Sequence, residues 1–151
     1  MSARHAAHVD AGVPTTVDFR DIADADVEQV VSLWETCGLT RPWNDPRLDV
    51  ADARANPTST VLVGVLGDEV LATAMVGYDG HRGWLYYLAV SPGAQRSGLG
   101  RATTGAAESW LRDRGVRKLR LMVRRGNEQV LGFYEGLGYA DSDCVVLGRD
   151  L

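Results

Sequence analysis

Apolar residues recur along the chain with two periods, which predict the order of its strands and helices. Thr60–Leu66 and Glu69–Tyr78 are apolar, β-branched runs separated by a short Gly-Asp turn, as in an antiparallel hairpin. Trp84–Val90 (WLYYLAV) is almost continuously apolar and predicts a strand buried on both faces. Val27, Val30, Val31 and Trp34 recur at helical spacing. The other expected elements are a strand at Val17–Arg20, helices at Leu48–Ala55, Gly98–Gly115 and Asn127–Leu137, and strands at Val116–Val123 and near Val145–Leu147.

This order, βααβββαβαβ, predicts one layered α/β domain with a mixed (α+β) sheet flanked by helices. Residues 1–16 are rich in Ala, Thr, Gly and Pro without a clear period. We therefore expect a flexible N-terminal tail over residues 1–16 and a folded domain over residues 17–151. No apolar run approaches the ~20 residues needed to span a bilayer, so no membrane partner is expected.

Charge and cysteine content narrow the functional classes. The net charge of −4 argues against broad binding to a phosphate backbone, so no nucleic acid partner is expected. Cys37 and Cys144 do not form a C-x-x-C pair, which indicates neither a zinc site nor a redox pair, and no metal is expected. Two unpaired thiols favour a reducing compartment and a cytoplasmic protein.

The first candidate site is a glycine-rich loop between the strand Trp84–Val90 and the helix that follows. Backbone N–H groups at a strand–turn–helix junction, together with the helix dipole, can hold a pyrophosphate, and glycines let the backbone approach it. The alternative is that the glycines only serve the turn. The loop consists of Gln95, Arg96, Ser97, Gly98, Leu99, Gly100 and Arg101.

The second candidate is the block Asn127–Tyr139. Asn127 is a plausible N-cap for a helix, and Tyr134 follows two turns later on nearly the same face. Phe133 is expected to be a core aromatic, and Gly138 to stop the helix. A core role is the alternative for Tyr134 as well, but a phenol near a thioester could give a proton to the departing thiolate.

Taken together, Q-R-S-G-L-G-R after W-L-Y-Y-L-A-V-S-P and N-x-x-x-x-x-F-Y-x-x-x-G-Y downstream resemble the GNAT acetyltransferase superfamily. The similarity covers nearly all of Val17–Arg149. Arg41–Pro46 and Gly77–Gly83 further resemble its YpeA-like bacterial branch. The resemblance implies a GNAT-like fold whose predominantly antiparallel sheet splays between its fourth strand, which carries a bulge, and its fifth.

The resemblance also implies acetyl-CoA as cosubstrate and roles for individual residues. Backbone groups of Leu88 and Val90 would pair with the pantetheine arm, and an N–H within Leu88, Ala89 or Val90 would polarise the thioester. The Gln95–Arg101 loop would hold the pyrophosphate. Asn127 would contact the pantetheine arm, and Tyr134 would be the general acid. The expected reaction is direct attack of a primary amine, from a small molecule or a protein, on the acetyl carbon.

The acceptor side is less defined. The strand Trp84–Val90 contains no acid, and Met122 stands where protein N-terminal acetylases of this fold often have glutamate. The candidate bases are Glu35, Asp45, Asp79 and His81, with plain turn chemistry as the alternative at Asp79. An acceptor pocket is expected from Trp43, Asn44, Asp45, Asp79, His81 and Tyr86. Trp43 could equally be a lid over the core.

Two other functional classes stay open. One is an acyl-CoA-binding sensor of GNAT fold without turnover, and the other is a nucleotide-binding regulator that uses the same loop. The family resemblance fits either a monomer or a homodimer.

Overall fold

A computed structural model describes residues 6–10 and 14–151. The chain divides into two compact units, Met1–Leu121 and Met122–Leu151, which are considered separately. The first unit holds a six-stranded sheet in the order β1-β2-β3-β4-β5-β6. All neighbours are antiparallel except β5 and β6, which are parallel. The mixed, predominantly antiparallel sheet of the predicted fold class is therefore confirmed.

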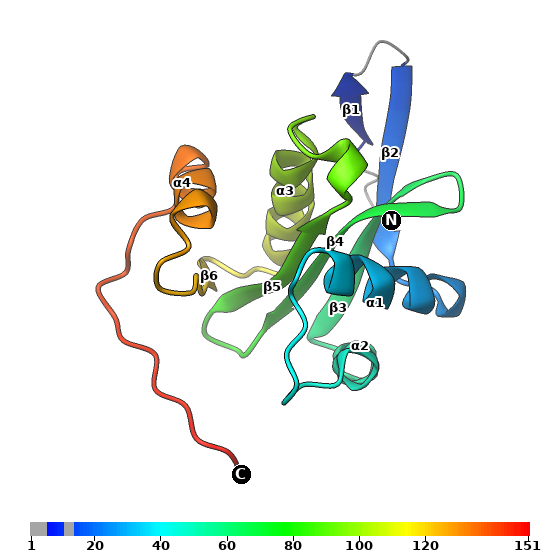
Figure 1. Ribbon diagram of the computed structural model, residues 1–151. Helices are drawn as coiled ribbons and strands as arrows, with labels where there is room; N and C mark the ends of the chain where they lie inside the picture. Colours follow the sequence, from blue (N-terminus) through cyan, green and yellow to red (C-terminus); the bar gives the residue numbers. More distant parts are fainter. Residues whose placement is uncertain (1–5, 11–13) are drawn as a thin grey trace. The chain divides into compact units, whose positions relative to one another are not determined.

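The strands and helices of the first unit follow the predicted order, with one strand added at the start. The strands are β1 (Ala6–Asp10), β2 (Pro14–Asp21), β3 (Ser59–Leu66), β4 (Glu69–Tyr78), β5 (Gly83–Val90) and β6 (Leu119–Leu121). The helices are the short 3-10 helix η1 (Asp24–Asp26), α1 (Val27–Thr36), α2 (Pro46–Ala55), the 3-10 helix η2 (Pro92–Ala94) and α3 (Leu99–Arg112). Figure 1 shows α1 and α2 on one face of the sheet and α3 on the other.

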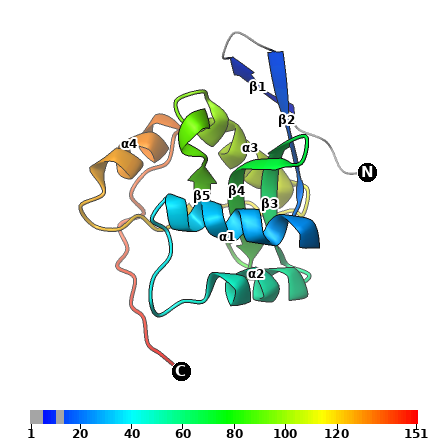
Figure 2. The same cartoon turned by 45° about the vertical axis from the view of Figure 1, so that its right-hand side comes forward.

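Both faces of the sheet centre are buried because helices cover both. Every residue of β3 from Thr60 to Val65 is buried. On one side, Val61 and Val63 pack in a core with Trp34 of α1 and Val50 of α2, and Figure 2 shows these two helices in front of β3 and β4. On the other side α3 approaches closely, since a Cβ on Gly83 would lie 2.6 Å from Cδ1 of Leu111.

Ion pairs and caps fix the helices on the first of these faces. Asp26 accepts a bidentate bond from Arg20, with Nη1 at 2.6 Å and Nη2 at 3.0 Å, and also the Ala23 N–H at 2.7 Å. This arrangement joins β2 to the start of α1. Asp45 caps α2 by accepting the N–H groups of Arg47 and Leu48.

Two predicted segments differ from the structure. The flexible tail expected over residues 1–16 is wrong at 6–10 and 14–16, where the backbone pairs as β1 and β2; residues 1–5 and 11–13 lie outside the described residues. Backbone hydrogen bonds pair the two strands of this hairpin, whereas residues 1–16 have no apolar period from which a strand could be predicted. The strand expected near Val145–Leu147 is also wrong: within the described chain no strand follows residue 121. A β-branched run becomes a strand only with a partner, and Leu147 is 90% exposed.

The second unit contains one helix, α4 (Glu128–Gly136). Asn127 is its N-cap, with Oδ1 accepting the Val130 N–H at 3.3 Å. At its end Gly138 has φ +92°, and the N–H groups of Gly138 and Tyr139 bond the carbonyls of Glu135 and Tyr134. This is a Schellman ending, which confirms the predicted cap and the glycine stop.

Candidate functional site: a bulged strand and an anion-binding turn

The strand β5 carries a bulge opposite β4. Thr73 pairs with Ala89 and Met75 pairs with Tyr86, so two residues, Tyr87 and Leu88, stand opposite Ala74. Tyr87 has φ +50°, a left-handed conformation that is costly for an aromatic side chain. Bulges of this kind bend a strand and redirect its backbone groups. The fourth strand expected from the sequence, Trp84–Val90, corresponds to β5, so the bulge expected on it is present.

Just before the bulge, β5 loses its second neighbour. The β5–β6 ladder runs from Gly83↔Leu119 to Leu85↔Leu121, whereas β5 continues to Val90. Ser91 N donates to Leu71 O at 2.7 Å. Because antiparallel ladder bonds alternate by two residues, Ala89 also faces β4, and the N–H and C=O groups of Leu88 and Val90 point away from it. The end of β5 thus presents backbone hydrogen-bonding groups to the side where the ladder has ended.

The Val90 carbonyl on this side accepts two side-chain donors. Cys37 Sγ donates to it at 3.4 Å and Gln95 Nε2 donates at 3.1 Å. Burial raises the pKa of the Cys37 thiol, which does not suit a nucleophile. Cys37 therefore serves as a hydrogen-bond donor to the strand end, and Gln95, expected in the loop, reaches back to the same carbonyl.

The loop Gln95–Arg101 has the backbone of an anion-binding turn. Arg96 has φ +64° and Gly98 has φ +83°. Ser97, which lies between them in the chain, donates from its Oγ to the Ala94 carbonyl. Left-handed residues in a turn can direct neighbouring backbone N–H groups toward one side. The first helical bond of α3 joins Ala102 N to Gly98 O, so the N–H groups of residues 99–101 have no acceptor within the helix.

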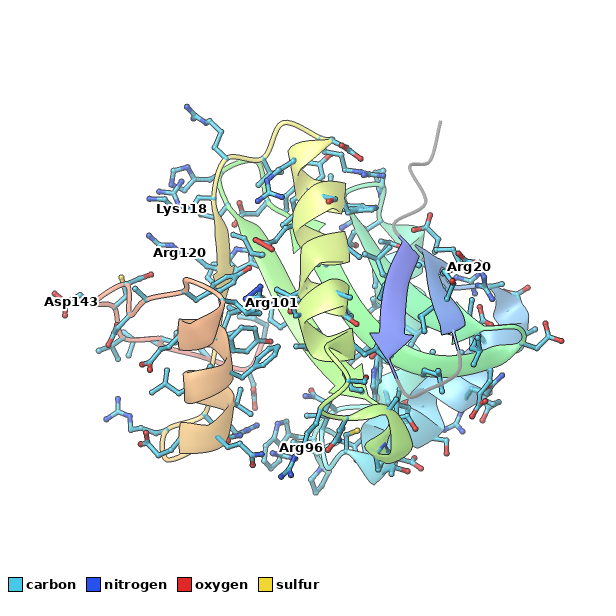
Figure 3. The ribbon with its side chains drawn as sticks, turned by 90° about the horizontal axis from the view of Figure 1, so that it is seen from above. Arg20, Arg96, Arg101, Lys118, Arg120 and Asp143 are labelled. Atoms are coloured by element: carbon cyan, nitrogen blue, oxygen red, sulfur yellow. The ribbon has the colours of Figure 1, made fainter. Side chains whose placement is uncertain are left out.

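Positive charge accompanies these N–H groups. Arg96 lies on the loop before α3 and Arg101 on its first turn, and both side chains are exposed (Figure 3). Buried Leu99 anchors the start of the helix in the core. The loop can therefore bind an anion with backbone donors, the helix dipole and two guanidinium groups.

A set of contacts that the sequence did not reveal surrounds the bulge. The ring of Tyr87 stacks on Trp34 with centroids 3.8 Å apart and planes 10° from parallel. Tyr87 OH donates to Asp49 Oδ2 at 2.6 Å. Thr73 Oγ1 donates to the Tyr87 carbonyl at 2.9 Å and accepts Trp34 Nε1–H at 2.8 Å. Burial and the bond to Asp49 raise the pKa of Tyr87. No short motif links these residues, since they come from α1, α2, β4 and β5.

Asp79, a candidate base, already accepts hydrogen bonds within the turn between β4 and β5. Its carboxylate accepts the N–H groups of Arg82 at 2.8 Å and His81 at 2.9 Å, and Trp84 Nε1–H at 3.3 Å. These donors lower the pKa of Asp79 to about 2. Such a carboxylate is a weak proton acceptor near neutrality. His81 is exposed in the same turn, beside Arg82.

Tyr86 is the acceptor-side candidate nearest the bulge. Its side chain is 42% exposed, which corrects the expectation that Trp84–Val90 is buried on both faces. The reason is that β6 accompanies β5 only to Leu85, so one side of the strand beyond it lacks a neighbour. Burial of part of the ring, with a smaller effect of the Asp79 charge, raises the pKa of the Tyr86 phenol.

The other candidates lie on the connection between α1 and α2. Trp43 is 71% exposed, so its ring is not a lid packed on the core. Asn44 is exposed, and Asp45 is occupied as the cap of α2. Glu35 is exposed on α1. Among the described residues, no hydrogen bond or ring contact joins residues 43–45 to Asp79 or Tyr86.

In the second unit, Tyr134 is only 7% exposed. Its ring makes edge contacts with Phe133, at a centroid distance of 5.0 Å, and with Tyr139, at 5.5 Å. Burial raises the pKa of Tyr134 to about 12, so the phenol stays protonated throughout the neutral range. A protonated phenol can donate a hydrogen bond, as the proposed acid must.

Within the described residues, no group of three or more His, Cys, Asp or Glu side chains is arranged to hold a metal ion. In the same part of the chain, none of the helices combines the length and the apolar character that a bilayer crossing requires.

Known proteins share sequence and fold with this chain. Residues 27–139 match the model of the acetyltransferase (GNAT) family. The protein named Acetyltransferase ECA0875 of Pectobacterium atrosepticum is 41% identical over 135 residues, which span 89% of this chain and 96% of that protein.

Solved structures show the same fold at low sequence identity. The aminoglycoside N-acetyltransferase AAC(6')-Iy in complex with CoA superposes with a TM-score of 0.78 at 14% identity, over 93% of this chain and 98% of that one. An aminoglycoside acetyltransferase from an uncultured soil metagenomic sample, in complex with trehalose, gives a TM-score of 0.73 at 18% identity, over 89% and 96%. The family match and the close bacterial relative establish that this chain belongs to the GNAT acetyltransferase family.

Proposed function

We propose that this protein is an N-acetyltransferase that transfers the acetyl group of acetyl-CoA to a primary amine by direct attack in a ternary complex. One observation carries the proposal: β5 has a bulge, loses its parallel neighbour after Leu85, and leads within a few residues into the anion-binding turn before α3. Backbone donors for an acyl chain and for a pyrophosphate therefore follow one another along one short stretch of chain.

Different residues of this stretch would bind different parts of acetyl-CoA. The N–H and C=O groups of Leu88 and Val90 would pair with the pantetheine arm, which would displace Gln95 and Cys37 from the Val90 carbonyl. An N–H within Leu88–Val90 would stabilise the oxyanion that forms at the thioester carbon. The loop Gln95–Arg101 would hold the pyrophosphate. The CoA-bound neighbour supports this assignment by its fold.

In the chemical step, the neutral amine nitrogen forms a bond to the acetyl carbon and the carbon–sulfur bond breaks. Tyr134 would donate a hydrogen bond, and then a proton, to the departing sulfur. The proton that the amine nitrogen loses would pass to solvent water, from which the Tyr134 phenolate is reprotonated. A phenol of pKa about 12 transfers a proton readily only if the thiolate is also poorly solvated, because burial raises the pKa of both groups. Asn127 would contact the pantetheine arm.

The acceptor is proposed to be a cationic amine. Trp43, Asn44 and Tyr86 are exposed polar or aromatic groups suited to it, whereas Asp45 and Asp79 are already used by a helix cap and a turn. Two neighbours are aminoglycoside acetyltransferases, so aminoglycosides belong among the acceptors to test, beside polyamines, amino acids and lysine peptides. The YpeA-like branch, a cytoplasmic location and the oligomeric state stay predictions.

The test is thiol release from acetyl-CoA with this acceptor panel, followed by mass analysis of the product. Acetylation of an amine supports the proposal. Tight CoA binding without thiol release from any acceptor contradicts it and supports the acyl-CoA sensor instead.

A further inference from the structure

The bulge of β5 is held by groups from three other elements. A left-handed tyrosine is strained, so the surroundings must stabilise it. At the Tyr87 backbone, Thr73 of β4 binds the carbonyl, and Trp34 of α1 binds Thr73 in turn. At its side chain, the ring stacks on Trp34 and the phenol donates to Asp49 of α2 at 2.6 Å.

Both ends of Tyr87 are therefore held in place. Its carbonyl and its hydroxyl bond to different elements, and the stacked ring between them prevents rotation about the side-chain bonds. The Tyr87 carbonyl and the Leu88 N–H belong to one planar peptide group, so the backbone conformation of Tyr87 determines where the Leu88 N–H points. The position of Asp49 therefore influences the direction of this N–H through the phenol and ring of Tyr87.

We infer that Asp49 and Tyr87 are positioning residues of the acyl-transfer site: by anchoring the Tyr87 phenol, Asp49 holds the bulge in the conformation that directs the Leu88 N–H. The inference rests on the proposed function for its catalytic consequence, but the anchoring itself is a property of the fold. Neither residue is proposed to touch the acceptor amine or to carry its proton.

The variants separate anchoring from other roles. Tyr87→Phe keeps the stack on Trp34 and removes the hydroxyl, and Asp49→Ala removes the acceptor of the same bond. Asp49→Asn retains an acceptor oxygen without the charge. Asp52→Ala is the matched control, since Asp52 is an exposed carboxylate on the same helix.

The first measurement is amide hydrogen exchange over residues 84–92, which needs no acceptor. Tyr87→Phe and Asp49→Ala are expected to speed exchange there by roughly ten-fold, with Asp49→Asn intermediate and Asp52→Ala unchanged. Exchange in the two removal variants equal to that of the unaltered protein would overturn the inference, even if the protein had no turnover with any amine.

The second measurement is turnover with the best acceptor. Tyr87→Phe and Asp49→Ala are each expected to lower kcat roughly ten-fold, with the Kd for CoA within about two-fold, because the pyrophosphate loop is untouched. The double variant should lose no more than either single variant, because both remove one bond.

The opposite pattern refutes the inference. If Asp49→Asn loses as much as Asp49→Ala while Tyr87→Phe remains fully active, Asp49 acts directly on the acceptor. The acid limb of the pH profile would then also change in Asp49→Asn. If no amine supports thiol release in the unaltered protein, the proposed function fails. The hydrogen-exchange experiment then still tests whether Asp49 anchors Tyr87.

Discussion

Gly98, the residue before α3, offers a quantitative test of the anion-binding turn. Its φ is +83°, and a Cβ built on it meets no atom within 4 Å. Replacement by alanine therefore introduces no clash, and its effect comes from the backbone conformation alone. A left-handed residue with a Cβ is less stable by about 1–2 kcal/mol, which for a chain of this size lowers the melting temperature by about 2–4 °C per kcal/mol.

Gly105→Ala supplies the matched control within the same helix. A Cβ there also meets nothing within 4 Å, but Gly105 lies in the interior of α3 and has no positive φ. Alanine is favoured over glycine in a helix interior, so this variant should gain about 0.5–1 kcal/mol. The same substitution should therefore change the free energy of unfolding in opposite directions at two positions seven residues apart, and urea denaturation measures this change.

The functional consequence follows from the same geometry. If the altered residue relaxes to negative φ, the N–H groups at the start of α3 no longer point to one side, and CoA should bind roughly ten-fold more weakly, or about 1.4 kcal/mol. Gly105→Ala should bind CoA normally in the same calorimetric titration. A Gly98→Ala protein as stable as the control and with unchanged CoA affinity would refute the assignment of the turn.

Three further changes test other parts of the molecule. Tyr134→Phe should retain CoA binding and lower turnover by roughly 10²–10⁴; full activity would remove Tyr134 from the mechanism. Gly64→Ala should destabilise the first unit by about 1–3 kcal/mol, because the new Cβ would lie 2.8 Å from Cε1 of Phe19; thermal unfolding measures this, and unchanged stability would show that the sheet relaxes there. The bond from Arg20 lowers the pKa of Asp26, so its stabilising effect is present above the unfolded pKa of about 3.9 and is lost as the pH falls through the folded value. Lowering the pH below 4 should therefore reduce the free energy of unfolding more for the unaltered protein than for Asp26→Asn. Parallel profiles of stability against pH would contradict the role of the pair.

Much of the fold was predictable because its core elements have strong periods or clear end signals. Glu69–Tyr78 matches β4 at both ends, and the helices near the loop and at Asn127 begin within a residue of their predicted starts. The hairpin β1–β2 was missed because its pairing, rather than its apolar pattern, specifies it. Val145–Leu147 was overpredicted for the opposite reason, since a strong β pattern has no ladder partner there.

The candidate site was only half predictable. The loop Gln95–Arg101 could be found because glycine spacing reports directly on backbone geometry. The anchoring of Tyr87 could not, because its left-handed conformation depends on Asp49, Thr73 and Trp34, which are distant in sequence. Asp45 and Asp79 were named for their charge, but hydrogen bonds to neighbouring N–H groups determine what these carboxylates do.

The strand order of the sheet has a consequence for biosynthesis. Because the order in space equals the order in the chain, each new strand can add to an edge that has already been synthesised. The antiparallel additions from β1 to β5 need no strand that is still inside the ribosome. Only β6 must cross over through α3 to pair in parallel, which makes it the slowest addition. During translation, β5 is therefore the last strand to acquire its second neighbour, and it does so only from Gly83 to Leu85.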